Sequence, residues 1–299
     1  MTGTGRRAQW PIWGEDELPY SKGVMARALM AGGLAAHQAY ELAQRVELEL
    51  EDGRSFDFDR VQELAVEQLG EEAGGRAVRR LRRVRDLQQL DEPVILLIGG
   101  ATGTGKSTVA TEAAYRLGIT RVTSTDFVRQ TMRAFFSHEF MPSIHYSSFE
   151  AGDGIEEPEG DAAIQGFQEQ TRNVLVGVRA AIDRALEEGW SMVLEGVHLV
   201  PGMLPLMVTD ALVVPCVLAI SDTEAHAAHF WIRDAISEGL RPVERYLDRL
   251  PDIRRMQDYI IERARRAGVP VIENADVENA IGAVIELVLT AASGRLEHV

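Results

Sequence analysis

The chain has 299 residues, of which 45% are hydrophobic and 26% charged, as in an ordinary globular protein with a full-sized core. Its net charge of −15 disfavours long-range attraction to DNA, RNA or anionic lipid, so neither nucleic acid nor a membrane is expected as a partner. We find no apolar run close to the roughly 20 residues of a membrane helix, and no signal-peptide core at the start. The single cysteine, Cys216, excludes an intrachain disulfide. A cytoplasmic protein is expected.

The first 90 or so residues are predicted to be mostly helical. Ser21 is placed to cap a helix that runs through Leu29 to the Gly32-Gly33 pair. Further helices are expected at about 36–49 and from about residue 59, where apolar residues recur at helical spacing.

An arginine-rich stretch then closes this segment, and two interpretations of it remain open. Its cations are Arg76, Arg79, Arg80, Arg82, Arg83 and Arg85, with an apolar stripe of Val78, Leu81, Val84 and Leu87 between them. The arginines either form a phosphate or nucleic-acid patch or are the solvated face of a packed helix. The acidic net charge favours the solvated face.

From residue 93 the pattern changes to strands that alternate with helices. Strands are expected at 93–98, 119–124, 190–194, 211–220 and 269–272, and helices at 106–117, 161–188 and 277–291. This order predicts an α/β fold with a five-stranded parallel sheet flanked by helices. We therefore divide the chain into a small helical domain, 1–90, and an α/β domain, 91–299.

Two details of the α/β domain carry separate expectations. Because Pro215 has no backbone N–H, the fourth strand should be an edge strand or be broken there. The acidic, Gly- and Pro-containing segment 150–161 should be an exposed loop.

A phosphate-binding loop follows the first buried strand. The residues Gly100, Ala101, Thr102, Gly103, Thr104, Gly105, Lys106, Ser107 and Thr108 contain the pattern G-x-x-x-x-G-K-[ST] without a mismatch. Its glycines let successive backbone amides face phosphate oxygens at the start of a helix. Lys106 is placed to reach the β- and γ-phosphates, and the Ser107 hydroxyl to bind Mg²⁺. The loop predicts a nucleoside triphosphate site.

Three residues after the second strand are candidates for contact with the acceptor. Carboxyl ends of parallel strands face one crevice, so Asp126 should lie near the γ-phosphate, where a carboxylate can accept a proton or hold Mg²⁺. Arg129 and Arg133, four residues apart, would present a basic face to an anionic acceptor. Alternatively, Asp126 only caps the helix.

Further candidates lie after the third strand and near residues 233–255. Glu195, at the end of a hydrophobic strand, is placed to orient Mg²⁺ or its waters. His198 either contacts substrate or is a buried, hydrogen-bonded histidine. A basic helical segment could be a mobile lid that excludes water during phosphoryl transfer, or a solvated charged helix; its arginines are Arg233, Arg241, Arg245, Arg249, Arg254 and Arg255.

Several strings together resemble the 2-phosphoglycerate kinase family over about residues 93–275. They are GGATGTGKST, TSTDFVRQTMR, MPSIHYSS, GFQEQ, VLEGVHLVPG and GVPVIEN. The resemblance implies a P-loop kinase fold and ATP-dependent phosphorylation of the C3 hydroxyl of 2-phosphoglycerate, which gives 2,3-bisphosphoglycerate. It implies ATP and Mg²⁺ as cofactors and a small anionic substrate as partner.

We expect the following roles in such a site. The catalytic residues would be Lys106, Asp126, Arg129 and Arg233, and the metal ligands Ser107 and Glu195. The substrate would be bound by Asp126, Arg129, Arg133, His145, Ser147, Ser148, His198, Arg241 and Arg245.

The first 90 residues resemble the ATP-cone, a small nucleotide-binding regulatory module. The similar positions are Pro19 to Gly23 with Lys22, the helix through Leu29, and Ala39-Tyr40-Glu41. The basic pair that usually opens the module is replaced by an acidic stretch at 11–16. A structural or dimerising role is therefore an equal alternative to nucleotide binding there.

Two other functions stay open from sequence. Phosphoryl transfer is mostly positioning and electrostatics, so the acceptor could be another phosphorylated acid, sugar or polyol. Alternatively, the chain is an ATP-dependent sensor or assembly protein, in which the N-terminal segment governs a homo-oligomer.

Overall fold

The computed structural model of the chain describes residues 20–51, 57–156, 159–204, 210–236 and 243–296. It separates into two compact units. One contains residues 1–92 together with 113–119 and 285–299, and the other contains residues 93–112 and 120–284. The predicted division into two continuous domains, 1–90 and 91–299, stays a prediction. Residues 113–119 and 285–299, from two later helices, group with the first unit.

The N-terminal unit begins with four helices, as expected from sequence. They are α1 (Lys22–Ala31), α2 (Ala36–Glu51), α3 (Phe58–Leu69) and α4 (Glu71–Gln88). Ser21 is the N-cap of α1, and its hydroxyl accepts a hydrogen bond from the Val24 amide. The helix ends before Gly33, whose φ of 89° is readily adopted only by glycine.

Helix α4 buries the apolar stripe predicted from its sequence. Val78, Leu81 and Val84 are each at most 1% exposed. Because these residues recur every three or four positions, they share one face of the helix, and the arginines between them lie outside it.

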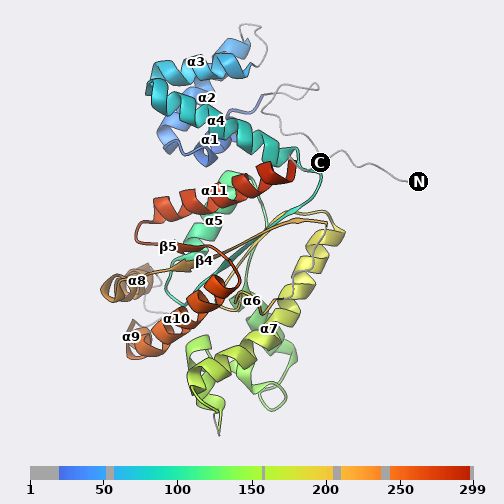
Figure 1. The fold of residues 1–299 in the computed structure, drawn as a ribbon, viewed down its shortest axis with the longest axis vertical. Coiled ribbons are helices and arrows are strands. Elements are labelled where there is room, and N and C mark those ends of the chain that lie inside the picture. The colour runs from blue at the N-terminus through green and yellow to red at the C-terminus, as the bar shows by residue number, and fades with distance from the viewer. Residues whose placement is uncertain (1–19, 52–56, 157–158, 205–209, 237–242, 297–299) are drawn as a thin grey trace, which may run out of the picture. The chain divides into compact units, whose positions relative to one another are not determined.

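The second unit is built on a five-stranded, all-parallel sheet, which confirms the predicted α/β class (Figure 1). Its strands are β1 (Val94–Gly99), β2 (Val122–Ser124), β3 (Met192–Glu195), β4 (Leu212–Ala219) and β5 (Val271–Glu273). Their order in the sheet is β2-β3-β1-β4-β5. The chain passes from β1 to one side of the sheet and later to the other, so the end of β1 is a topological switch point, where ligands bind in open α/β sheets.

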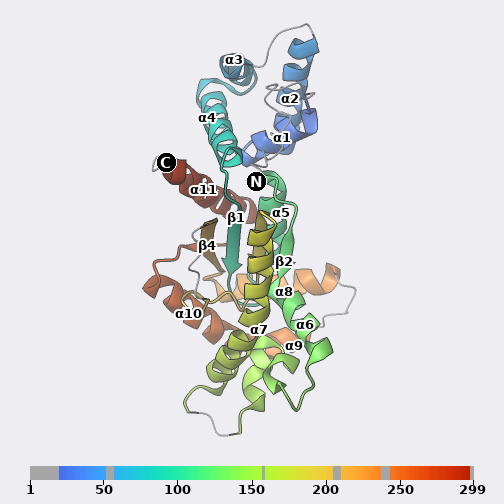
Figure 2. The same ribbon diagram turned by 90° about the vertical axis from the view of Figure 1, so that its right-hand side faces the viewer.

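Helices accompany the sheet, and Figure 2 shows α7 running beside β1. They are α5 (Lys106–Leu117), α6 (Thr125–Phe135), α7 (Ala162–Glu187), α8 (Thr223–Ile236), α9 (Val243–Asp248), α10 (Leu250–Arg266) and α11 (Val277–Leu296). One core cluster joins Ile95 and Leu97 of β1 to Val178 of α7, all at most 5% exposed. A second joins Val217 of β4 to Ile260 of α10.

Strand β4 corrects the expectation for Pro215. The strand is continuous and internal, and Pro215 pairs in register with Leu97 of β1. The amide of Leu212 donates toward β1 and that of Val217 toward β5, and alternate residues of a strand donate to opposite sides. Pro215 therefore lacks its N–H on the β5 side, where pairing begins only at Val217. The missing donor removes no hydrogen bond of this sheet.

The acidic segment differs from expectation only at its start; residues 153, 154, 156 and 159–161 are exposed, as expected. It opens with a short 3₁₀ helix, η2 (Ser148–Gly154), rather than an open loop, and Ala151 within it is only 2% exposed. A Cβ on Gly166 of α7 would lie 2.3 Å from the Ala151 carbonyl oxygen. The close approach of η2 to α7 explains why the first residues of this charged segment are helical and partly buried.

Helix α11 corrects the statement on apolar runs. An 18-residue window of this 20-residue helix has a mean hydropathy of 1.3, so the helix is long and apolar enough to cross a membrane by length and composition. Its apolar residues, however, form a packed stripe: Ile281, Val284, Val288 and Leu289 are at most 1% exposed. In all, 39% of the window is buried, so the helix has one packed face.

Candidate functional site

The phosphate loop connects β1 to α5, as predicted. Its turn requires glycine at two positions in particular. A Cβ on Gly100, at φ 141°, would lie 2.3 Å from the Leu218 carbonyl oxygen, and one on Gly103, at φ 86°, would lie 2.5 Å from Phe230. The backbone therefore approaches β4 and α8 more closely than any side chain permits.

Two further residues of the loop are placed for phosphate and metal binding. Lys106 is 9% exposed, and its Nζ donates a 2.6 Å hydrogen bond to the Ala101 carbonyl, so the ammonium folds back over the loop. The Ser107 hydroxyl donates to Glu195 Oε1 at 3.0 Å. Glu195 ends β3, pairs in register with Ile98 and is 6% exposed.

A hydroxyl and a carboxylate suit Mg²⁺, which binds few protein oxygens and otherwise water and phosphate. Within the described ranges, no cluster of three or more His, Cys, Asp or Glu side chains could hold a metal by itself. The Ser107–Glu195 pair is therefore the part of the described chain that fits this cation.

Asp126 lies at the same edge of the sheet. Ser124, which ends β2, pairs in register with Glu195 and is the N-cap of α6, its hydroxyl accepting from the Phe127 amide at 3.0 Å. The alternative that Asp126 caps the helix is therefore wrong. Its carboxyl is 67% exposed and so available to a ligand.

The charge of Asp126 is set by opposing effects. Partial desolvation acts to raise the pKa of Asp126, but the positive charges around it, among them those of Arg129 and Lys106, outweigh this effect. The pKa of this carboxyl therefore lies below its ordinary value. Asp126 is ionised at neutral pH and can accept a proton.

Arg129 and Arg133 do not form one free basic face. Arg129 is 7% exposed and donates to the carbonyls of Ile144 at 2.9 Å and Tyr146 at 2.8 Å. Its Nε also approaches Asp126 Oδ1 at 3.4 Å. Arg133 is only partly buried, and it donates to the Gln130 side chain at 3.2 Å. Arg129 thus ties α6 to the following turn, η1 (Pro142–His145).

The predicted substrate residues of the 143–148 segment differ in their surroundings. The His145 Nε2 lies 3.0 Å from the Phe136 carbonyl. Ser147 accepts a hydrogen bond from Arg245 at 3.0 Å, whereas Ser148 is 7% exposed. Ser147 is therefore the member of this segment that faces the arginine-rich helices.

Of the two interpretations of His198, the structure fits the second, a buried and hydrogen-bonded histidine. It is completely buried; its Nδ1 lies 2.8 Å from the Thr125 hydroxyl and its Nε2 2.9 Å from Gln170 Oε1. Because Gln170 Oε1 can only accept, Nε2 carries the proton and Thr125 donates to Nδ1. Burial lowers the pKa of His198 to about 3, so the ring is neutral.

Gln170, a site residue that sequence reasoning missed, connects these groups. Its amide nitrogen donates to the carbonyls of Ser143 at 2.6 Å and Tyr146 at 3.0 Å. His198 and Arg129 therefore act on the same turn from two sides. Only the string GFQEQ in the sequence pointed to this position.

The arginines of the predicted lid meet the acidic segment. Arg245 donates to both carboxylate oxygens of Glu150, at 2.9 and 2.6 Å, and Arg249 to Asp153 at 2.5 Å. Arg254 instead donates to the Ser221 carbonyl at 2.9 Å. Arg241 lies outside the described residues, and the structure does not describe the side chain of Arg233.

Three other residues that sequence reasoning missed contact the phosphate loop. His226 and His229 of α8 lie 2.8 Å from the Thr102 carbonyl and 3.0 Å from the Gly103 carbonyl, respectively. Asn274, directly after β5, donates to the Thr104 carbonyl at 2.9 Å. The asparagine could have been found from its place at a strand end; the histidines gave no local signal.

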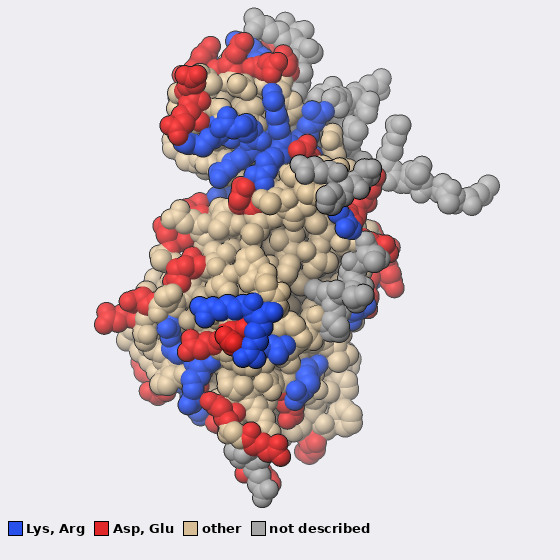
Figure 3. Space-filling view, viewed as in Figure 1, with Lys and Arg blue, Asp and Glu red and all other residues tan. Residues whose placement is uncertain are grey.

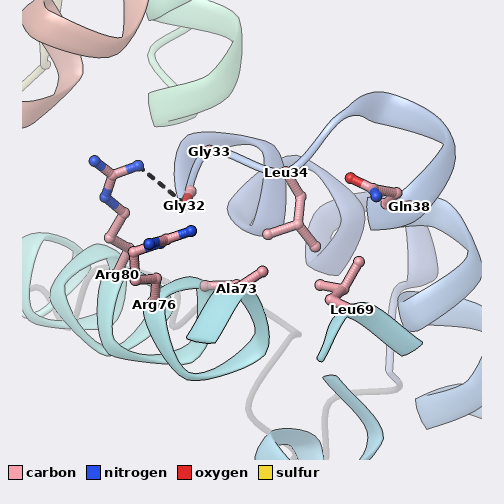
Figure 4. A pocket seen from close by; sticks show the side chains of 9 residues that line it. Gly32, Gly33, Leu34, Gln38, Leu69, Ala73, Arg76 and Arg80 are labelled. Atoms are coloured by element: carbon pink, nitrogen blue, oxygen red, sulfur yellow. Dashed lines mark hydrogen bonds between the residues drawn. The ribbon is translucent and has the colours of Figure 1, made fainter. Parts of the chain in front are cut away.

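The N-terminal unit has a cavity of about 160 Å³ beside the Gly32-Gly33 turn (Figure 4). Arg76 and Arg80 line it, and Arg80 donates to the Gly32 carbonyl at 3.4 Å. Both cations also face acids: Arg76 pairs with Glu72, and Arg80 lies 3.8 Å from Glu286.

Basic side chains gather on this unit in Figure 3, with acidic ones beside them. Lys22 pairs with Glu47 of α2 at 2.9 Å, and residues 11–16 lie outside the described chain. Nucleotide binding by residues 1–90 stays a prediction beside the structural alternative.

The chain resembles several known proteins over most of its length. It is 34% identical over 281 residues to a 2-phosphoglycerate kinase of Methanopyrus kandleri, covering 91% of this chain and 84% of that protein. The 2-phosphoglycerate kinases of Thermococcus kodakarensis and Methanothermobacter thermautotrophicus are 36% and 39% identical, with 90% of this chain covered in each case and 92% and 89% of those proteins. No family model matches the chain.

Proposed function

The chain belongs to the 2-phosphoglycerate kinase family, and we propose that it transfers the γ-phosphoryl group of ATP to the C3 hydroxyl of 2-phosphoglycerate. The products are ADP and 2,3-bisphosphoglycerate. The observation that carries the proposal is the meeting of three groups at one sheet edge: the phosphate loop after β1, Asp126 after β2 and Glu195 at the end of β3.

The chain's own residues perform three tasks in this reaction. The loop amides and Lys106 hold the ATP phosphates, and Lys106 exchanges its bond to the Ala101 carbonyl for the phosphate oxygens. Asp126 accepts the proton of the C3 hydroxyl as its oxygen attacks the γ-phosphorus and the bond to the β-phosphate oxygen breaks. We assign Arg233 to stabilising the negative charge of the phosphoryl group during transfer. We assign Arg129 to holding the turn at residues 144–146, next to the proposed acceptor site.

ATP and Mg²⁺ are the general requirements of such a kinase. When bound, the cation neutralises charge that develops on the phosphate oxygens. Ser107 and Glu195 would hold it, directly or through water. Their side chains already face each other at 3.0 Å.

The acceptor carries a phosphate and a carboxylate, so its binding requires cationic side chains that can exchange their present partners for these anionic groups. Arg245 is the best-placed candidate, because it is 52% exposed and already binds a carboxylate and the Ser147 hydroxyl. Ser147, His145, Arg133 and Arg241 complete the proposed acceptor side. His198 and Ser148 act indirectly, since both are buried. We place the reaction in the cytoplasm; a homo-oligomer stays a prediction.

Phosphorus NMR of the purified chain with ATP and Mg²⁺ tests this assignment. The chain is offered 2-phosphoglycerate and, separately, 3-phosphoglycerate. Growth of a bisphosphoglycerate signal with the 2-isomer alone is expected. ADP and free phosphate without that product would mean that the acceptor is a different anion, and unchanged ATP would favour the sensor interpretation.

The two lysines of the chain give a matched pair of variants. Lys106→Ala should abolish turnover, because the loop loses its only side-chain cation. Lys22→Ala removes the other lysine, which pairs with Glu47 in the N-terminal unit, and should leave turnover unchanged. Equal activity of the two variants would contradict the proposed ATP site.

A further inference from the structure

Consecutive carbonyl groups of the phosphate loop are each held by a side chain from a later part of the sequence. His226 lies at the Thr102 carbonyl, His229 at the Gly103 carbonyl and Asn274 at the Thr104 carbonyl, at distances of 2.8, 3.0 and 2.9 Å. A carbonyl oxygen only accepts, so each contacting nitrogen must donate. The loop is thus hydrogen-bonded along its outer side.

The two histidines donate from different ring nitrogens. His226 uses Nε2, and its Nδ1 is buried with no hydrogen-bond partner among the described residues, so the bond to Thr102 fixes the tautomer. His229 uses Nδ1. The burial of His226 also lowers its pKa, which keeps the ring neutral. This difference between the rings makes the contact testable.

Packing fixes His226 against the loop. Its ring stacks on Phe230 with centroids 5.6 Å apart, and Phe230 stacks on Tyr246 at 5.0 Å. A Cβ on Gly103 would meet Phe230 at 2.5 Å and His226 Nε2 at 3.0 Å. Helix α8 therefore lies directly against the loop, and its side chains have little freedom to turn away.

Peptide geometry gives these contacts a consequence for the ligand. In a trans peptide the carbonyl of one residue and the N–H of the next point in opposite directions. Holding the Thr102 and Thr104 carbonyls outward turns the amides of Gly103 and Gly105 inward, toward the anion site. The Thr104 amide, which follows the carbonyl that His229 contacts, instead donates to the Ala101 carbonyl at 3.4 Å and closes the turn of the loop. We propose that His226 and Asn274 preset the loop amides for the phosphates of ATP and that His229 holds the turn between those amides, so that all three are positioning residues.

This inference rests on the proposed ATP site and predicts a specific pattern of rescue. A glutamine side chain places its amide nitrogen near the position of Nε2 of histidine, and an asparagine places it near Nδ1. His226→Gln should therefore retain the bond to Thr102, whereas His226→Asn and His226→Leu lose it. For His229 the order is reversed: the asparagine variant retains the bond and the glutamine variant loses it.

The experiment measures binding of ATP with Mg²⁺ to the full chain by calorimetry, without acceptor, and KM for both substrates. His226→Leu and His226→Asn should raise the Kd for ATP about tenfold, and His226→Gln by less than about threefold, as for the loss of one hydrogen bond. KM for the acceptor should not change. His229→Asn and His229→Gln should show the opposite order.

Equal ATP affinity of the Gln and Asn variants at both positions would overturn the inference, whatever the leucine variant does. Those variants keep a polar amide, so they also serve if His226→Leu fails to fold. Failure of the proposed function has a different signature: the wild-type chain would not bind ATP, or would bind it and form no bisphosphoglycerate. Normal wild-type binding with the expected rescue supports the positioning role.

Discussion

Asp126 is the exposed, ionised carboxylate that we propose as the proton acceptor beside the predicted phosphates. Asp126→Asn keeps the shape and removes the proton acceptor, so kcat should fall by roughly 10²- to 10⁴-fold while the Kd for ATP changes little. Single-turnover kinetics and calorimetry measure the two quantities. Asp183→Asn, at an exposed carboxylate paired with Arg179 on α7, is the matched control. Normal turnover of the Asp126 variant would refute its assignment as the base.

His198 should make the stability of the chain depend on pH. Its pKa is lowered from 6.5 to about 3 in the folded chain, so between these values only the unfolded chain binds the proton. The neutral, buried His198 therefore contributes fully to the free energy of unfolding above pH 6.5. This contribution is lost as the pH falls toward 3, by up to about 1.4 kcal/mol per pH unit.

Urea unfolding of the wild type and His198→Gln measures this difference. Glutamine can keep the bond to Gln170 and has no titratable ring, so the stability advantage of the wild type should shrink steadily below pH 6.5. A difference that stays constant from pH 7 to pH 4 would mean that His198 is protonated as easily as in the unfolded chain.

At the level of residues, sequence reasoning located in the fold those groups whose position follows from a local pattern, and their chemical roles stay predictions. The loop at 100–108 and the strand-end acids were evident from short strings. The contacts of His226 and His229 with the loop join residues more than 120 positions apart, so no local pattern contains them. Arg129 was predicted to bind the acceptor from its charge and its spacing to Arg133. Its hydrogen bonds to the carbonyls of Ile144 and Tyr146 depend on the tertiary structure, so the sequence did not reveal them.

Helices α9 and α10 and the short helix η2 are joined by two ion pairs, and only one of them involves a proposed substrate residue. Arg245 is bound by Glu150, whereas Arg249 is bound by Asp153. The Glu150 carboxylate occupies the place at Arg245 that we assign to the acceptor's anionic group, so the two compete.

Glu150→Gln should therefore lower KM for the acceptor by about two- to fivefold, in line with the strength of exposed ion pairs. Asp153→Asn removes the neighbouring carboxylate and should leave that KM unchanged. Steady-state kinetics at saturating ATP compare the two. A rise in KM for Glu150→Gln would mean that this carboxylate orients Arg245 for the acceptor rather than competing with it.

Elements were predicted with good agreement where periodicity was strong. Helix α5 begins and ends at the predicted residues, and α7 within one residue of them. The strand β2 is shorter than predicted, because its register with β3 begins at Val122, and before it only the Arg121 carbonyl accepts a hydrogen bond from β3, from the Val193 amide at 2.8 Å. The short helix at 148–154 was not predicted. Its acidic composition is typical of an exposed loop, and its packing on α7 depends on the tertiary structure.

At the scale of the whole chain, the N-terminal helices share a unit with the ends of α5 and α11. In that unit Arg83 pairs with Glu286 at 2.6 Å, and Arg295 with Glu92 at 2.6 Å. Val288 and Leu289 are fully buried, and each contributes roughly 1.5–3 kcal/mol when buried. The sequence could not predict this arrangement, because nothing local marks a helix as divided between two units.

Removal of residues 1–90 should accordingly lower Tm by roughly 10 °C or yield insoluble protein, because residues 285–296 lose the helices with which they form one unit. Calorimetry and the mass in solution, with and without ATP, measure this. Arg83→Ala, which removes a single ion pair, should lower Tm by no more than about 4 °C. An unchanged Tm after the deletion would show that the first 90 residues stabilise nothing in the rest of the chain.

The backbone of β4 has a consequence for solubility. Strand β5 pairs with β4 only from Val217 onward, so among the described residues the preceding part of β4 has no strand partner on that side. An open edge invites pairing with a strand of another molecule, and each such pairing needs a donor from alternate residues. At Pro215 that donor does not exist. Pro215 removes no hydrogen bond within this sheet, but it therefore opposes edge-to-edge aggregation between copies of the chain.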